Sequence, residues 1–99
     1  MNMQQMIIQA QKMQREMQKK QKELEEKEFT ISKGGAVTVV VKGDKTVKSI
    51  DIDKDALDPD NKEMVEELIA LAINEAVEQI RAKEEEISSS VSGGMGGLF

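Results

Sequence analysis

Residues 1–27, MNMQQMIIQAQKMQREMQKKQKELEEK, decide how the rest of the chain can fold. Almost every residue in this stretch is a strong helix former, and it contains no Gly, Pro, Thr or Val. We predict one continuous helix of roughly 40 Å, at about 1.5 Å per residue. A helix of this length gains its stability from packing against another element, and we expect that element to be a second copy of the chain.

Two different faces run along this helix. Apolar side chains recur in steps of three and four, which is the a/d heptad pattern of helix packing. This apolar seam consists of Met3, Met6, Ala10, Met13, Met17 and Leu24, with Lys20 at the position that breaks the series. The outer heptad positions carry a cationic stripe, which consists of Lys12, Arg15, Lys19 and Lys22.

The period of the apolar residues changes from 3.6 to 2 after this helix, which predicts strands at 28–32, 36–42 and 46–53. Val37, Val39 and Val41 would share the buried face of the central strand, with Val40 on its other face. In the third strand we expect the isoleucines Ile50 and Ile52 to point inward, with a bulge near Ser49. Short turns join the three strands into an antiparallel meander.

A second amphipathic helix is predicted at about 61–87, after Pro59 and with Asp60 as its capping residue. Its broad apolar stripe should cover the valine face of the sheet. We expect Ser88–Ser90 to end this helix, residues 1–92 to form a single domain, and residues 93–99 to be a flexible Gly-rich tail. The predicted fold class is α+β, with a helix, three strands and a helix in two layers.

The composition excludes most enzyme chemistry. The chain has no His, Cys, Tyr or Trp, so it lacks the usual nucleophiles, bases and transition-metal ligands. Asp51, Asp53 and Asp55 match the start of a calcium loop, but Ala56 replaces its glycine and Lys62 its closing glutamate. We therefore expect no catalytic residues, no metal and no cofactor. No apolar run of 18 residues and no signal peptide is visible, so we expect a soluble, cytoplasmic protein without a membrane partner.

The charge is unevenly distributed. The chain carries a net charge of −5, but residues 1–27 carry +2 and residues 62–99 carry −5. Because a polyanion responds to the local field, the first helix is a candidate surface for contacting phosphates. Lys outnumbers Arg by twelve to two, and well-placed aromatics are absent, which favours weakly sequence-specific contact with duplex rather than single-stranded nucleic acid. A solvated helix face and, for the methionine seam, an adaptable peptide-binding groove are the alternatives.

The order of these parts resembles the YbaB/EbfC family of bacterial nucleoid-associated proteins. The resemblance covers nearly the whole chain and is carried by the first helix, by GGAVTVVV at 34–41, by SIDID at 49–53, by LDPDNKEMVEELIALAINEAV at 57–77 and by the tail ending in Gly97-Leu98-Phe99.

This resemblance implies a tweezer-like homodimer that binds double-stranded DNA with little sequence specificity, alters its conformation, and affects nucleoid organisation and gene expression. Charge placement gives the DNA-binding candidates Lys12, Arg15, Lys19, Lys20, Lys22, Arg81 and Lys83. The candidates for a dimer or helix-packing seam are Met3, Met6, Met13, Met17 and Val40. The alternative function is a protein-interaction adaptor, with a replication, repair or chaperone-like partner, that uses the methionine seam and the tail Leu98-Phe99.

Overall fold

The computed structural model describes the backbone of residues 2–96 and the side chains of residues 2–90. The chain order is α1 (Met3–Glu26), β1 (Glu28–Lys33), β2 (Val37–Lys42), β3 (Val47–Ile52), two short 3-10 turns and α2 (Lys62–Gly96). The strands form one antiparallel sheet in the order β1-β2-β3. The predicted α+β class and the order of its elements are confirmed, and the strand bounds differ from the predicted ones by one residue.

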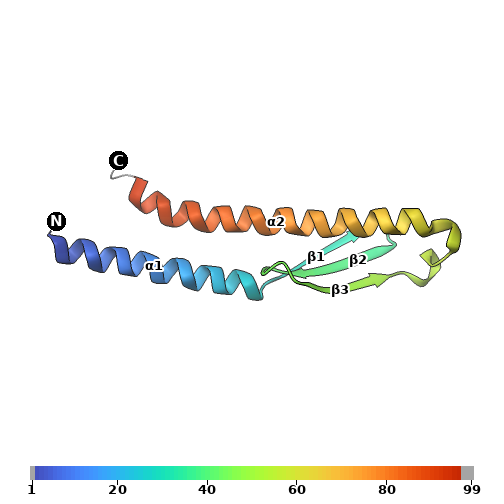
Figure 1. The fold of residues 1–99 in the computed structure, drawn as a ribbon, viewed down its shortest axis with the longest axis horizontal. Coiled ribbons are helices and arrows are strands. Elements are labelled where there is room, and N and C mark those ends of the chain that lie inside the picture. Colours follow the sequence, from blue (N-terminus) through green and yellow to red (C-terminus); the bar gives the residue numbers. More distant parts are fainter. Residues whose placement is uncertain (1, 97–99) are drawn as a thin grey trace.

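The core lies between one face of the sheet and the first half of α2 (Figure 1). Val39 and Val41 of the central strand have no exposed surface, and Phe29 and Ile31 of β1 are buried beside them. Ala72, Ala76 and Ile80 of α2 are fully buried against this face. The two alanines are small, so the helix backbone approaches the valines closely. The valine face is therefore covered as predicted.

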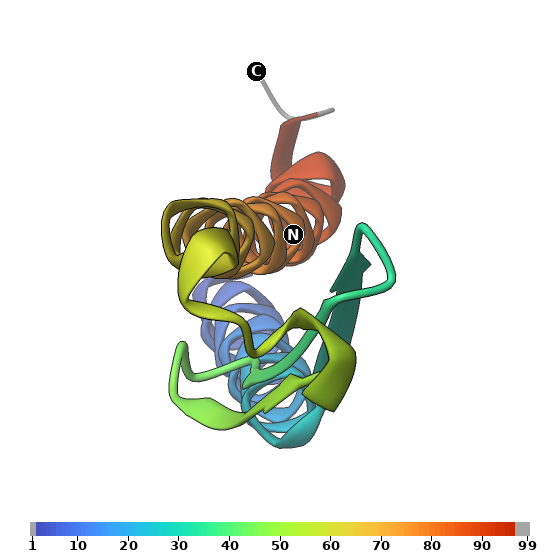
Figure 2. The same cartoon turned by 90° about the vertical axis from the view of Figure 1, so that its right-hand side faces the viewer.

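The prediction that Ile50 points into the core is wrong. Ile50 lies opposite Val39 in the sheet and so on the same face, but its side chain is 45% exposed. Because α2 packs over β1 and β2 and barely reaches β3, this edge of the face is left open. Figure 2 shows β3 as the strand farthest from α2. Ile52 is half-buried, and the predicted bulge is present, with Lys48 as the extra residue between Val47 and Ser49.

Both ends of α2 differ from the predicted helix. It begins at Lys62, directly after a 3-10 turn in which the Asp58 carboxylate accepts the N–H of Asp60, so Asp60 does not cap it. The three serines predicted to end the helix continue it instead, and α2 runs to Gly96. The Ser90 hydroxyl donates to the carbonyl of Ile87, so its polar group is satisfied inside the helix. Leu98 and Phe99 lie outside the described residues.

The extra length of α2 supports α1. The two helices lie side by side beyond the sheet, with the described N-terminus and the end of α2 at the same end of the molecule (Figure 1). Leu24 of the apolar seam is buried, and Met13 and Met17 are half-buried. The packing partner of this part of the seam is therefore α2 of the same chain, and not the second copy that we expected. Met3 and Met6, nearer the N-terminus, are exposed.

The molecule is elongated, with extents of 69 × 23 × 14 Å. Its radius of gyration is 19.7 Å, whereas a compact chain of this length would have about 13 Å. The cause is the pair of helices that extends past the sheet. We call this helical extension, α1 with the second half of α2, the arm.

The junction between arm and sheet is tightly packed around Gly43. The N–H of Gly43 donates to the carbonyl of Lys27, and the N–H of Lys27 donates to that of Leu24. A Cβ atom placed on Gly43 would lie 1.7 Å from the Leu24 carbonyl oxygen, so no larger residue fits without moving the backbone. The contact fixes where α1 ends and the direction in which it leaves the sheet.

We expect Gly43→Ala to lower the free energy of unfolding by about 1–3 kcal/mol, the usual cost of overpacking. Urea unfolding followed by circular dichroism measures this change. Gly35→Asn is the control, because nothing lies near a Cβ there and Asn tolerates the positive φ of +64°. Equal stability of the Gly43→Ala and wild-type proteins would show that the junction is loose.

Leu24 and Met3 occupy equivalent heptad positions of α1 but differ in burial. Leu24→Ala should lower the free energy of unfolding by about 2–5 kcal/mol, because it removes buried methyl groups. Met3→Ala should leave it nearly unchanged, because Met3 is 77% exposed. Paired denaturant titrations of the two variants test this difference, and a large loss in the Met3 variant would mean that the tip of α1 is covered in solution.

Candidate nucleic-acid interface

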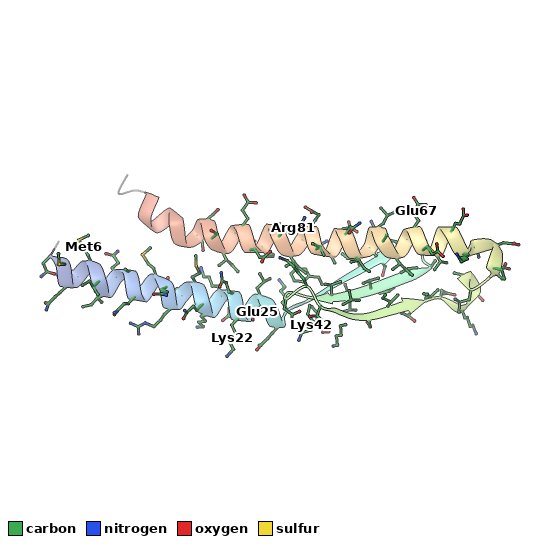
Figure 3. All side chains as sticks on the ribbon, in the orientation of Figure 1. Met6, Lys22, Glu25, Lys42, Glu67 and Arg81 are labelled. Carbon is green, nitrogen blue, oxygen red and sulfur yellow. The ribbon has the colours of Figure 1, made fainter. Side chains whose placement is uncertain are left out.

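The cationic stripe forms one continuous ridge on α1. Lys12, Arg15, Lys19 and Lys22 follow one another in steps of three, four and three, which places them on one face of the helix. The seam residues Met13, Met17 and Leu24 hold the opposite face against α2, so the stripe faces solvent. Figure 3 shows Lys22 pointing away from α2. The ridge is about 15 Å long, at about 1.5 Å per residue.

No salt bridge neutralises this ridge within the part of the chain whose side chains are described, 2–90. The other two candidates differ in this respect. Arg81 forms an ion pair with Glu78 at 2.8 Å, and Lys83 forms one with Glu86 at 3.1 Å. Their charges are compensated on α2 itself, so they offer a weaker field to an anion.

Lys20 does not lie on the ridge. It occupies a seam position, and its Nζ donates to the Ser90 hydroxyl of α2 at 3.1 Å. This side chain connects the two helices of the arm. Among the side chains of residues 2–90, the four stripe residues have no comparable partner. The break in the apolar seam therefore corresponds to a polar contact between the helices.

Negative charge is kept away from the N-terminal half of α1. No acidic residue occurs before Glu16, whereas four glutamates lie between Glu23 and Glu28. A shallow surface depression of α1 is lined by Glu16, Lys19, Lys20 and Glu23. The least compensated positive charge therefore lies toward the tip of the arm.

Two residues that we did not predict as DNA-binding candidates also lie on the side of the molecule that carries the cationic ridge. Lys42 at the end of β2 points to the same side as Lys22 in Figure 3, and its half-buried position follows from its place on the central strand. Ile8 lies four residues before Lys12 and so extends the ridge by one turn, with its side chain 60% exposed. The spacing of four residues before Lys12 could have identified Ile8 as part of the ridge from the sequence alone. The position of Lys42 on this side can be seen only from the pairing of the strands.

The seam candidate Val40 lies apart from the methionines. It is half-buried on the face of the sheet that points away from α2, opposite Thr30 and Ser49 of the flanking strands. The hydroxyls of Ser32 and Thr38 are 3.0 Å apart on this same face. The structure therefore does not bring Val40 together with Met3 and Met6.

One cleft beside the turn between β2 and β3 offers no catalytic group. It has a volume of about 320 Å³ and lies at the junction of arm and sheet, lined by Gln21, Leu24, Glu25, Gly43, Asp44, Lys45 and Glu84. Hydrogen bonds from Thr46, through its side chain and then its backbone N–H, lower the pKa of Asp44, so this carboxylate is ionised at neutral pH. Its oxygen accepts the Thr46 N–H at 2.9 Å, which shapes the turn between β2 and β3.

The aspartates of the partial calcium motif have local structural contacts. The Asp53 carboxylate accepts the N–H of Asp55 at 2.8 Å and caps a 3-10 turn. Among the described residues, no three His, Cys, Asp or Glu side chains gather as metal ligands would. Neither helix within residues 2–96 is long and apolar enough to cross a membrane.

Comparison with known proteins identifies the family. Residues 1–95 match the family model described as the YbaB/EbfC DNA-binding family. A nucleoid-associated protein of Mycoplasmopsis pulmonis is 45% identical over 94 residues, which cover 95% of this chain and 93% of that protein. A nucleoid-associated protein of Clostridium botulinum strain Eklund 17B is 50% identical over 103 residues, covering 99% and 88%. One from Clostridium novyi is 48% identical over 99 residues, covering 99% and 84%. The chain therefore belongs to the YbaB/EbfC DNA-binding family, which is a family of nucleoid-associated proteins and not of enzymes.

Proposed function

We propose that this protein is a homodimeric nucleoid-associated protein that binds duplex DNA through the cationic ridge of α1. In the cytoplasm it would alter DNA conformation and so affect nucleoid organisation and gene expression. The observation that carries the proposal is the position of the ridge. Packing against α2 leaves Lys12, Arg15, Lys19 and Lys22 together on the outer face of the arm, without salt bridges among the described side chains.

The chemistry of the ridge favours phosphate contacts with little sequence preference. Three of its four cations are lysines, which act as mobile point charges rather than as bidentate readers of base edges. Stacking with unpaired bases needs exposed aromatic rings, but Phe29 is buried and Lys27 lies 5.6 Å from its ring centre. Phe29 and Phe99 are the only aromatic residues in the sequence. Duplex DNA therefore fits this surface better than a single strand does.

The acidic residues of α2 favour one orientation of DNA on the protein. Eight acidic and three basic residues lie between Lys62 and Phe99. In Figure 3 Glu67 points away from the sheet and from α1, whereas Lys22 points to the opposite side of the molecule. A polyanion is attracted to one side and repelled from the other, so net charge does not oppose binding on the α1 side.

The open edge of the sheet is the surface we propose for the second copy. Val47 and Ile50 of β3 are 41% and 45% exposed although they lie on the apolar face of the sheet. Lys45, in the turn before β3, forms an ion pair with Glu84 of α2. Ile73 and Val77 of α2 are half-buried and could extend the apolar surface beside this edge. A second copy that covered this aliphatic edge would remove apolar area from water and direct two arms outward.

An adaptor function is the second candidate, because Met3, Met6 and Ile7 are exposed at the tip of the arm. Methionines adapt to differently shaped partners. Replacing Met3 and Met6 with Gln keeps the helix and removes the apolar tip. If the protein is an adaptor, this change abolishes partner capture and spares DNA binding.

Salt titration of DNA binding tests the ridge. About five phosphate contacts would give a slope of log K against log salt of roughly −4 to −5. Replacing all four ridge cations with Gln should flatten this slope to about −1, because each lost contact removes about 0.9. The control replaces the ion-paired Lys62, Arg81 and Lys83 with Gln and should change the slope little. If the ridge variant keeps the wild-type slope, DNA binds elsewhere.

The mass of the protein in solution tests the proposed dimer surface. Wild type should sediment at twice the chain mass of 11.0 kDa. Ile50→Asp should reduce the mass to that of a single chain, because a carboxylate would be buried without a partner. Met64→Asp is the matched control, because Met64 is 44% exposed and lies on α2 beside Gly34 and Ala36 rather than on β3. A dimer that tolerates Ile50→Asp would place the interface on another surface.

A further inference from the structure

Ile8 is an apolar side chain on the cationic face of α1. It precedes Lys12, Arg15, Lys19 and Lys22 by four, seven, eleven and fourteen residues, which is the spacing of one helix face. The side chain is 60% exposed. Because α2 packs on the opposite side of α1, nothing in the fold of the described residues explains an isoleucine at this position.

The helix that carries this ridge matches the major groove in size. An α-helix with its side chains is about 10–12 Å wide, and the major groove is about 12 Å wide, whereas the minor groove is about 6 Å wide. A ridge that faces the groove floor would bring Ile8 to the base edges, while the long lysines reach the phosphates on either side. The only apolar group that the bases present in this groove is the 5-methyl group of thymine.

We infer that Ile8 packs against thymine methyl groups in the major groove and gives the protein a weak preference for A·T pairs. The neighbouring glutamines support this inference. Gln4 and Gln5 lie four and three residues before Ile8 and so border it on the same face, and both are exposed. A glutamine amide can bind the N6 and N7 atoms of the adenine paired with that thymine. The inference rests on the proposed function and names the base feature that this surface reads.

The charge of this region supports DNA as the ligand. No acidic residue occurs in the first 15 positions, and α1 has none in its first turn. Lys12 follows one turn after Ile8, and Arg15 follows two turns after it. An apolar protein partner would be expected to contact the methionine seam, which lies on another face of the helix. Because Ile8 continues the cationic ridge, we expect it to lie on the face of α1 that contacts DNA.

A thermodynamic cycle between one side chain and one methyl group tests the contact. Two duplexes of identical sequence would be compared, one with thymine and one with uracil, so that they differ only in the 5-methyl groups. Wild type should bind the uracil duplex about two- to fourfold more weakly, as expected for losing one apolar methyl contact. Ile8→Ala should bind both duplexes equally, with an affinity close to that of wild type for the uracil duplex.

Ile7→Ala provides the matched control. Ile7 has the same side chain and is 52% exposed, but it points about 100° away from Ile8 around the helix and so lies off the ridge. This variant should keep the wild-type preference for the thymine duplex. If Ile7→Ala abolishes the preference and Ile8→Ala keeps it, the assignment of the DNA-facing side is wrong.

The outcomes separate this inference from the function on which it rests. Salt-dependent binding with equal affinity for the two duplexes would overturn the methyl contact and leave the proposed DNA binding intact. Absence of binding to either duplex at low salt would overturn both. Bending of DNA that Ile8→Ala abolishes, combined with equal affinity for the two duplexes, would also overturn the methyl contact and identify Ile8 as a wedge between base pairs.

Discussion

Burial of one sheet face under one helix determines the rest of the structure. Val39 and Val41 are fully covered because Ala72 and Ala76 let α2 approach the central strand closely. Two ion pairs lie at the margins of this contact, one between Lys33 and Glu75 and one between Lys45 and Glu84. Without this contact the three strands would expose their apolar face to water, which costs free energy in proportion to the apolar area.

The same helix also positions the cations. Because α2 continues beyond the sheet, it provides an apolar surface for Met13, Met17 and Leu24 of α1. Packing this seam turns the opposite face of α1 to solvent, and that face carries the lysines. Gly43 fixes where α1 leaves the sheet, since only a residue without a side chain fits against the Leu24 carbonyl. The fold thus links core packing to the presentation of charge.

The sequence predicted the elements better than their ends and partners. Periodicity identified both helices and three strands, because strong patterns of period 3.6 and 2 depend on local burial. It failed at Ile50, whose burial depends on how far α2 extends across the sheet, and at Ser88–Ser90, whose helical state depends on packing beside α1. The hydrogen bond of Lys20 to Ser90 could not be predicted either, because it depends on how the two helices pack. The four residues of the cationic stripe were predictable, because their spacing alone places them on one face.

The proposed function depends above all on the binding of DNA to the outer face of α1. Mapping amide chemical-shift changes on a ¹⁵N-labelled sample, as duplex DNA is added at low salt, tests it most directly. We expect the largest changes between Gln4 and Lys22, while the amides of Glu63–Glu78 on α2 change little. Changes concentrated on α2 or on β3, with α1 unaffected, would contradict it.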